Sequence, residues 1–325
     1  MAIVSARLVS AAKQPYLAFG IMVALLALAP FVVYPVFVMK ALCFALFACA
    51  FNLLLGYAGL LSFGHAMFFG TSAYGAAYAA KEWGASPELA ILFGVLVAAV
   101  LGAVIGALAI RRQGIYFAMI TLGFAQMIYF FCVQVPWTGG ENGLQGVPQG
   151  MLLGFLDLRN TTTLYFFVAA IFLFGFLTIY RTIHSPFGEV LRAIREHEPR
   201  MISLGYDVDR YKWLAFVLSA ALAGLAGSTK AIVFQLASLT DVHWTTSGEV
   251  VLMTLLGGLG RVWGPVVGAV IVITLENYLG PLGGWFTVIQ GIIFIVCVLL
   301  FRQGIVGEIA RLTRRRAPVE AARVD

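Results

Sequence analysis

The segment Arg181–Lys212, RTIHSPFGEVLRAIREHEPRMISLGYDVDRYK, decides how the rest of the chain is interpreted. It lies between two long apolar segments. In less than a tenth of the length it holds more than a quarter of all Lys, Arg, Asp and Glu residues. Because charged side chains are costly inside a lipid bilayer, this stretch is expected outside the membrane, where something must contact it.

The first half of this segment has the pattern of a short amphipathic helix. Ser185 is a suitable N-cap, and Pro186 takes the first helical position, where its missing N–H costs nothing. Apolar residues recur with helical spacing on one face: Phe187, Val190, Leu191 and Ile194. Pro199 is expected to end this helix, and a second short helix is expected before Gly205. The pattern predicts a helix–turn–helix patch on the membrane surface or, alternatively, a solvated loop whose helix rests on lipid headgroups.

The composition indicates an integral membrane protein. Of 325 residues, 61% are hydrophobic and 11% are charged, whereas soluble domains are roughly half apolar and about a quarter charged. The four cysteines lack paired spacing, so neither a disulfide framework nor a metal site is expected. With no cleavage site standing out after Arg7 and Lys13, the first apolar segment is interpreted as a retained span. The net charge of +6 follows membrane topology, and no nucleic-acid partner is expected.

Ten helical spans are predicted, taking about 20 apolar residues for each crossing. They are placed at residues 16–35, 37–56, 64–81, 89–110, 115–134, 163–181, 211–234, 240–257, 265–280 and 284–302. The eighth and ninth are the least regular, because Asp241–Glu249 is polar and leaves only Val250–Leu256 as a continuous apolar run.

The distribution of Lys and Arg predicts the orientation. With a cytoplasmic N-terminus and ten crossings, seventeen basic residues fall on the inner side and four on the outer side, which is a positive-inside pattern. Merging the eighth and ninth spans would place Arg311–Arg316 outside, so Gly257–Arg261 is interpreted as a bend on the cytoplasmic side. We therefore expect one transmembrane domain over residues 1–325, a cytoplasmic loop at 182–210 and a basic cytoplasmic tail at 303–325.

Small residues recur at the spacing that lets helices approach closely. They are Gly94, Ala98, Gly102 and Gly106, then Ser219, Ala223 and Gly227, then Gly264 and Gly268. Any bundle needs such faces, so they predict helix packing and not a binding site. The outer loop 135–162 is rich in Gly and Pro, which predicts turns. Composition leaves open whether it caps the bundle or meets an external partner.

Motifs for hydrolytic chemistry are absent from the sequence. There is no P-loop, no zinc-protease motif around His197 and no GxSxG serine. Only Glu249 and Glu276 are candidate buried carboxylates, fewer than an ion-coupled carrier usually has. We predict no catalytic residues, no metal site, no cofactor in this chain and no enzymatic activity. A bundle without energy chemistry but with a charged cytoplasmic patch indicates that energy comes from a partner.

Several motifs together resemble a known family. They are Ser185–Glu196, Leu204–Tyr206, Tyr211–Lys212, Ala215–Ala220, Ala223–Gly227, Asn52–Gly59, Ser62–Ala66, Gly114–Met119, Thr138–Gly140, Asn142–Leu144, Leu256–Gly260 and Trp263–Pro265. The chain resembles, over about residues 40–305, the LivM-type permease subunits of branched-chain amino acid ABC importers.

The resemblance implies an all-α polytopic membrane protein with about ten transmembrane helices. The bundle would be of the type II ABC importer kind, with inverted halves formed by spans two to five and seven to ten. Implied partners are a second homologous permease, two cytoplasmic ATPase subunits that bind ATP, and a periplasmic or extracellular solute-binding protein. Implied location is a bacterial inner membrane, with both termini cytoplasmic.

The function implied is ATP-driven import of branched-chain or related amino acids. His197 and Lys230 depart from the usual family pattern, so a related permease for urea or short amides stays an alternative. The alternative from another class is a stand-alone secondary carrier, which would transport without ATPase subunits. An intramembrane enzyme would need a paired catalytic constellation that the sequence lacks.

The helix after Ser185 is the predicted ATPase-coupling element. Its residues are Phe187, Gly188, Glu189, Leu191, Arg192, Ala193, Ile194, Arg195 and Glu196. We expect it to dock in a groove of an ATPase subunit. Phe187, Leu191 and Ile194 are expected to act as apolar anchors, while Arg192 and Arg195 meet acidic groups.

The predicted substrate path follows the eighth span. Thr246, Ser247 and Glu249 precede its apolar run, and a broken helix is a common way to expose polar groups to a cavity. Glu249 would receive an ammonium group; alternatively it reaches the outer surface or pairs with Lys230. Asn52 and His65 flank the first Gly-rich bend as candidates for an inner gate, or they simply tie that bend to neighbouring backbone.

Overall fold

The computed structural model describes residues 19–152, 154, 156–280, 285–300, 304–308 and 311. The longer helices are Phe19–Val32, α2 (Pro35–Asn52), α3 (His65–Glu82), α4 (Pro87–Ala109), α5 (Ile115–Gln134), α6 (Thr161–Ile183), α9 (Val208–Phe234), α11 (Trp244–Gly257), α12 (Gly264–Leu279) and α13 (Trp285–Leu300). The shorter ones are α7 (Pro186–Glu196), α8 (Glu198–Ser203), α10 (Leu239–Val242), the 3₁₀ turns η2 (Pro136–Thr138) and η3 (Gly140–Asn142), and the π-helix η1 (Leu53–Ala58). Four two-residue strands complete the fold: β1 (Leu144–Gln145), β2 (Met151–Leu152), β3 (Leu156–Asp157) and β4 (Leu236–Ala237).

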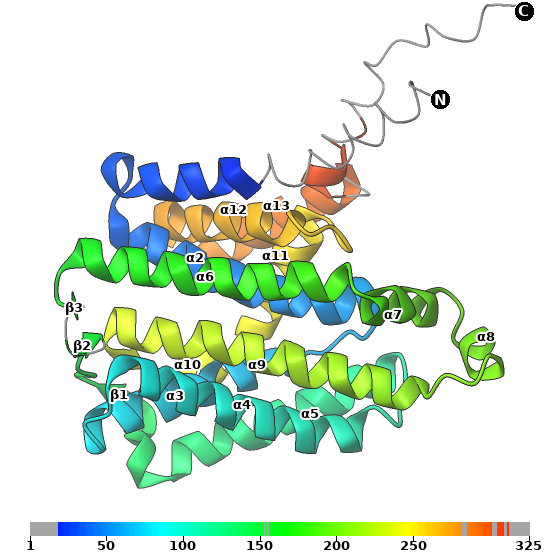
Figure 1. The fold of residues 1–325 in the computed structure, drawn as a ribbon, viewed down its shortest axis with the longest axis horizontal. Coiled ribbons are helices and arrows are strands. Elements are labelled where there is room, and N and C mark those ends of the chain that lie inside the picture. Colours follow the sequence, from blue (N-terminus) through cyan, green and yellow to red (C-terminus); the bar gives the residue numbers. More distant parts are fainter. Residues whose placement is uncertain are drawn as a thin grey trace, which may run out of the picture.

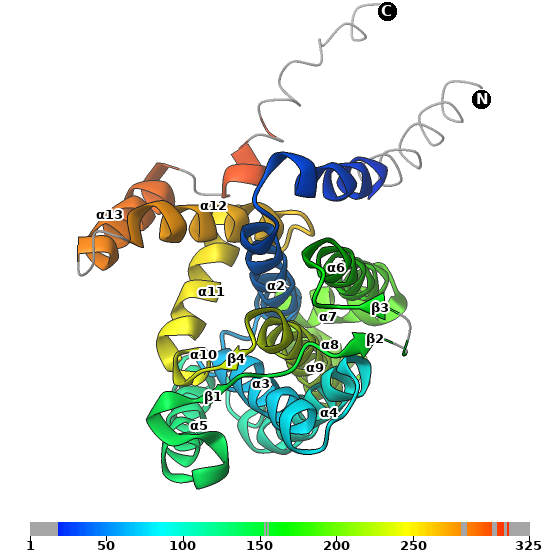
Figure 2. The ribbon, with the colours of Figure 1, turned by 90° about the vertical axis from the view of Figure 1, so that its left-hand side faces the viewer.

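Two ends of the bundle are distinct. Figure 1 shows the long helices running side by side, with α7 and α8 at one end and β1, β2 and β3 at the other. We call these the α7 end and the strand end. Figure 2, which looks along the bundle, shows α11 inclined between α10 and α12, with α13 beyond.

A helix lies at each predicted span. Five segments are long and apolar enough to cross a membrane: Pro35–Ala58, Pro87–Ala109, Ile115–Gln134, Thr161–Ile183 and Val208–Phe234. Phe19–Val32 and α12 are apolar but shorter. The first residues of the first predicted span, 16–18, and the last of the tenth, 301–302, lie outside the described residues, as does most of the predicted tail at 303–325. The described part is therefore a mainly helical, multi-pass bundle.

The predicted eighth span is broken. The helix α10 ends at Val242, the backbone at His243 is extended with ψ of 143°, and α11 begins at Trp244. The His243 side chain accepts a hydrogen bond from the Thr245 N–H and caps the new helix. The polar run therefore interrupts the helix before the apolar part of the span.

Helix α2 occupies the core because it is apolar on all sides. From Met39 to Asn52 every residue except Lys40 is buried. Helix α9 packs against α2, α3, α4 and α6. The predicted small residues of α4 face α9 there: a Cβ on Gly102 would lie 2.5 Å from the Cβ of Ala220, which is next to the predicted Ser219. Small residues thus let these helices approach closely, as predicted.

The outer loop 135–162 folds back on the strand end. Its strand β1 pairs antiparallel with β4, which follows α9, and β2 pairs with β3. The Val147 N–H donates to the Gln235 carbonyl at 3.2 Å, and the Lys81 ammonium donates to the Gln145 carbonyl at 3.1 Å. The prediction of turns is confirmed, and the loop caps this end of the bundle.

The polar segment forms two helices at the α7 end. Ser185 caps α7 by accepting a hydrogen bond from the Gly188 N–H at 3.4 Å, as predicted. Pro199, however, does not end α7, which is a correction. The helix ends at Glu196, the backbone turns at His197, and Pro199 lies in the first turn of α8, where it sacrifices no helical hydrogen bond. Gly205, with φ of +86°, follows α8.

Candidate functional site

The apolar face of α7 points into its own chain. Leu191 is fully buried and Ile194 is 2% exposed. The Phe187 ring stacks on Tyr211, with ring centroids 5.6 Å apart. Gly188 is buried against the Ile183 backbone. Leu191 and Ile194 therefore hold α7 against the bundle in this structure, and their role as ATPase anchors stays a prediction.

The opposite face of α7 is charged and open. Glu189, Arg195 and Glu196 are exposed, while Arg192 and Ala193 are half-buried. The Arg192 guanidinium pairs with Glu189 at 3.2 Å and lies 5.1 Å from the centroid of the Tyr57 ring. An exposed pair of this kind contributes only about 0.3–0.5 kcal/mol, so these charges remain available to a partner.

Arg195 reaches from α7 to the end of α2. Its Nη1 donates to the backbone carbonyl of Gly56, inside η1. Its aliphatic part lies against Gly59, where a Cβ would be 3.0 Å from the Arg195 Cγ. Within this chain the Arg195 guanidinium therefore has a backbone acceptor, and its contact with an acidic group of a partner stays a prediction.

Asn52 joins the end of α2 to the bend between α11 and α12. Its Oδ1 accepts from the Gly260 N–H at 3.1 Å, and its Nδ2 donates to the Arg261 carbonyl at 3.0 Å. The side chain is only 2% exposed. Both ends of the amide are thus used to hold backbone, which supports the tethering alternative over a direct contact with solute.

His65 begins α3 inside an aromatic cage. Its Nε2 lies 2.8 Å from the Ser219 hydroxyl, which in turn donates to the Ala50 carbonyl at 2.5 Å. Three rings approach the imidazole edge-on: Phe51, Phe68 and Phe216. The residue is fully buried, and its Nδ1 has no hydrogen-bond partner among the described residues. His65 therefore links α3 to α9 within the core.

Thr246 and Ser247 are also used internally. The Ser247 hydroxyl accepts from the Ala66 N–H at 2.8 Å, so it satisfies a free donor in the first turn of α3. The Thr246 hydroxyl donates to the Thr240 carbonyl at 2.7 Å, across the break between α10 and α11. Ser247 is fully buried and Thr246 is 8% exposed. Both residues hold the broken helix in place.

Glu249 belongs to a cluster of five charges toward the strand end. Lys230 pairs with Asp241, which corrects the suggestion that Lys230 pairs with Glu249. Lys40 of α2 pairs with Glu276 of α12 at 2.8 Å. The Glu249 carboxyl lies within electrostatic range of all four. Because the two ammonium groups each have a carboxylate, Glu249 is left without an ion pair among the described residues.

Sequence reasoning missed Lys40 and Asp241 as members of this cluster. Lys40 carried a signal, since it is a lone charge in a helix that is otherwise apolar and buried. The Lys230 ammonium also lies 5.9 Å from the Phe44 centroid and 5.8 Å from the Phe69 centroid. Such cation–π contacts help to hold a buried ammonium group.

A second polar group missed in the sequence lies near α7. Lys212 of α9 pairs with Glu198 of α8 at 2.7 Å, and the Gln113 side-chain amide donates to the same carboxylate at 2.8 Å. These residues, with Arg195, border a cavity of about 300 Å³. The Lys212 side chain is only 4% exposed, so the pair fixes α8 against α9.

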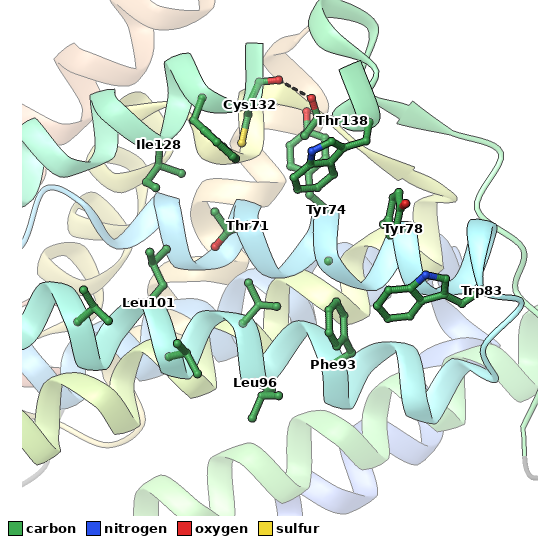
Figure 3. Close-up of a pocket in the computed structure, with 16 residues that line it drawn as sticks. Thr71, Tyr74, Tyr78, Trp83, Phe93, Leu96, Leu101, Ile128, Cys132 and Thr138 are labelled. Carbon is green, nitrogen blue, oxygen red and sulfur yellow. Dashed lines mark hydrogen bonds between the residues drawn. The ribbon is translucent and has the colours of Figure 1, made fainter. Parts of the chain in front are cut away.

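One large cavity is lined by none of the predicted path residues. It has a volume of about 640 Å³ and lies between α3, α4 and α5 (Figure 3). Its walls are aromatic and aliphatic; they include Tyr74, Tyr78, Trp83, Phe93 and Ile128. Leu96, on its α4 side, is 58% exposed. This groove opens on the outer surface of the bundle, where lipid is expected, and it is separate from α11.

Among the described residues, no group of three or more His, Cys, Asp or Glu side chains is arranged to hold a metal ion. The charges of the bundle are instead grouped as ion pairs between helices and as a surface on α7.

Comparison with known proteins identifies the family. The family described as "Branched-chain amino acid transport system / permease component" matches residues 34–300. The high-affinity branched-chain amino acid transport permease LivM of Salmonella typhimurium is 26% identical over 277 residues, or 78% of this chain and 65% of that protein. LivM of Escherichia coli is 25% identical over the same shares. The ribose import permease RbsC of Bacillus subtilis is 32% identical over 144 residues, 40% of this chain and 43% of that protein.

The matched stretch spans just under two thirds of the length of both LivM relatives. No solved structure matches the chain. The family match nevertheless covers most of this sequence, and the multi-pass bundle agrees with it. The resemblance to LivM-type permeases is thereby confirmed, and the chain belongs to the family of permease components of branched-chain amino acid transport systems.

Proposed function

We propose that this chain is the transmembrane permease subunit of an ATP-driven ABC importer that translocates branched-chain or related amino acids. The observation that carries the proposal is the family match over residues 34–300. The exposed charged face of α7 supports the proposal as well. A chain without a nucleotide-binding motif needs a surface that an ATPase subunit can bind and move. That surface is held rigidly by Leu191 and Ile194 beneath it.

The partners would be a second homologous permease, two cytoplasmic ATPase subunits and an external solute-binding protein. ATP would be bound by the ATPases, and this chain would need no cofactor and catalyse no reaction. Helix α5 exposes large apolar side chains, among them Ile115, Tyr116 and Met119, which suit lipid or a second permease. The role of the complete importer is inferred from relatives of which this chain matches only part.

The topology we propose has ten crossings, inverted halves and both termini in the cytoplasm of a bacterial inner membrane. A helix at each predicted position supports the count, and the basic residues at the α7 end support the orientation. These include Arg111, Arg112, Arg192, Arg195 and Arg261. A hydrogen bond to Asn52 joins the bend after α2 to the bend after α11. This contact is consistent with two structurally related halves of the bundle.

The solute path is proposed to follow α11, with Glu249 as the residue that receives the ammonium group. Its carboxylate lacks an ion pair among the described residues, and an uncompensated charge in a low-dielectric region favours a cation. The apolar part of α11 that follows, Val250–Leu256, suits an aliphatic side chain. Four further residues would hold the helices around this path in position, because their polar atoms form hydrogen bonds within the chain: Asn52, His65, Thr246 and Ser247.

Reconstitution tests the proposed function. The chain would be co-expressed with a second permease and two ATPases, placed in liposomes, and supplied with binding protein and radiolabelled leucine. We expect uptake only when ATP reaches the ATPases, and little competition by urea or acetamide. An ATPase variant unable to hydrolyse ATP is the control. Uptake by the chain alone, driven by a proton or sodium gradient, would instead establish the secondary-carrier alternative.

A further inference from the structure

Three segments that are distant in the sequence meet beside Arg195. The Arg195 side chain comes from α7, Gly56 from η1, and Gly260 from the bend between α11 and α12. Asn52, from the end of α2, bonds the N–H of Gly260 and the carbonyl of Arg261. We call this group the Arg195 junction. It joins the surface proposed to meet an ATPase to the inner end of α11.

Glycines allow the junction to form. A Cβ on Gly56 would lie 2.8 Å from the Gly260 backbone nitrogen, closer than real Cβ contacts come. A Cβ on Gly260 would lie 3.3 Å from the Gly56 carbonyl and 3.4 Å from the Arg195 Nη1. Gly260 also has φ of +70°, which glycine adopts readily. The two bends are therefore in direct backbone contact, and the guanidinium lies against both.

The segment that Arg195 holds has an unusual conformation. Helix α2 ends in six residues of π-helix, and Gly59 closes them with φ of +73°. Short π-helical segments are rare and are frequent at functional sites. Terminal carbonyls of such a helix need hydrogen-bond donors from outside, and Arg195 donates to the carbonyl of Gly56. A shift of α7 would pull on this carbonyl and, through Gly260 and Asn52, on the α11–α12 bend.

We propose that Arg195 is the positioning residue that transmits movement of α7 to the bends ending α2 and α11. Arg192, one turn earlier, contacts the Tyr57 side chain of η1 and Glu189 of its own helix, whereas Arg195 bonds backbone. The inference rests on the proposed function, because α7 moves only if an ATPase moves it. It goes further by naming the contact through which α11, the helix of the proposed solute path, would respond.

The test uses the assembled complex with Arg195→Ala, and Arg200→Ala as the matched control. Arg200 lies on neighbouring α8, is exposed, and forms no side-chain hydrogen bond or ion pair with the described residues. Leucine transported per ATP hydrolysed should fall about tenfold in Arg195→Ala, as expected for loss of a charged hydrogen bond, and stay unchanged in Arg200→Ala. Arg195→Lys, which keeps one donor, should recover part of the coupling.

A second readout separates transmission from a purely structural role. Leu259, in the α11–α12 bend, is 38% exposed, so Leu259→Cys can be modified by a maleimide. In the otherwise unchanged complex, its modification rate should differ about fivefold or more between nucleotide-free and vanadate-trapped states. In Arg195→Ala this difference should vanish while the ATPases remain bound and active.

Three results would count against this role or against its premise. If the rate difference survives in Arg195→Ala, Arg195 only caps η1. If Arg195→Ala releases the ATPases, the residue is a partner contact and not a transmitting link. If the complex with native Arg195 neither hydrolyses ATP nor transports leucine, the proposed function itself fails, and that outcome is separate from the role of Arg195.

Discussion

The two ends of the bundle use charge differently. Toward the strand end, charged side chains pair with one another between helices, as in Lys230–Asp241 and Lys40–Glu276. At the α7 end, Lys212–Glu198 is one further pair of this kind, but Arg195 bonds a backbone carbonyl and Glu196 stays exposed. The first arrangement fixes helices relative to one another. The second attaches glycine-containing bends to a surface that another protein can hold.

The difference indicates a division of labour. A largely buried ion pair such as Lys230–Asp241 gives little net stability, but breaking it is costly, so it defines geometry. Backbone contacts at bends can be rearranged by small movements, because glycines there tolerate changes of backbone angles. We therefore expect the strand end to determine stability and solute contact, and the α7 end to determine coupling to ATP.

The largest expected effect is on stability, from Asp241→Asn. It leaves the Lys230 ammonium, whose side chain is 15% exposed, without its carboxylate. The free energy of unfolding should fall by about 3–5 kcal/mol, which thermal unfolding in detergent can follow. The double variant Lys230→Met, Asp241→Leu is the control and should regain most of the loss. A single variant as stable as the parent would show that the pair is not buried in the membrane.

A smaller loss is expected from Asn52→Ala. The variant leaves the Gly260 N–H and the Arg261 carbonyl without their side-chain partner, which should cost about 2 kcal/mol. Hydrogen exchange at the Gly260 amide should accelerate. The control is Asn160→Ala, which removes the N-cap of α6 at the strand end and should cost about 1 kcal/mol without changing exchange at Gly260. Unchanged exchange at Gly260 in Asn52→Ala would argue against the tether.

The next effect concerns transport and not stability. Glu249→Gln removes the carboxylate proposed to receive the ammonium group, so leucine uptake should fall about tenfold while assembly and basal ATP hydrolysis persist. Glu141→Gln, in the exposed outer loop, is the control and should transport normally. Normal uptake by Glu249→Gln, or failure only through lost assembly, would make Glu249 a structural residue and move the path to another helix.

Local patterns in the sequence predicted the helices well and their partners poorly. The Ser185 cap, the helix positions and the irregular eighth span depend on neighbouring residues, and all were predictable. The amphipathic pattern of α7 located Leu191 and Ile194 on one face, but the same pattern suits a helix packed on lipid, on a partner or on its own chain. Only the fold shows that the chain itself covers them.

Long-range contacts explain the other differences. The contact from Arg195 to Gly56 joins residues 139 positions apart, and that from Asn52 to Gly260 spans 208 positions. No spacing rule links such residues. Lys230 pairs with Asp241 because the chain turns at β4 and α10, which brings that carboxylate back to α9. Charge pairing in a bundle is therefore decided by topology.

The smallest effect is expected from the C-terminal tail. Arg311, Arg314, Arg315 and Arg316 are predicted to be held by anionic lipid, each worth about 1 kcal/mol near the surface. Deleting residues 311–325 should therefore leave leucine uptake within about twofold of the full chain, since other contacts anchor the bundle. Uptake by proteoliposomes measures this, and lipid composition provides the control. A complete loss would mean that the tail has a specific partner.

The most direct test is to measure, by photo-cross-linking, which end of the bundle contacts an ATPase subunit. A photo-reactive benzoylphenylalanine would be placed at Glu196, exposed on α7, and, in a separate sample, at Glu141, exposed at the strand end. In a complex that hydrolyses ATP, irradiation should cross-link position 196 to an ATPase subunit and leave position 141 unlinked to it. Cross-linking of the ATPase at position 141, with none at position 196, would contradict the account.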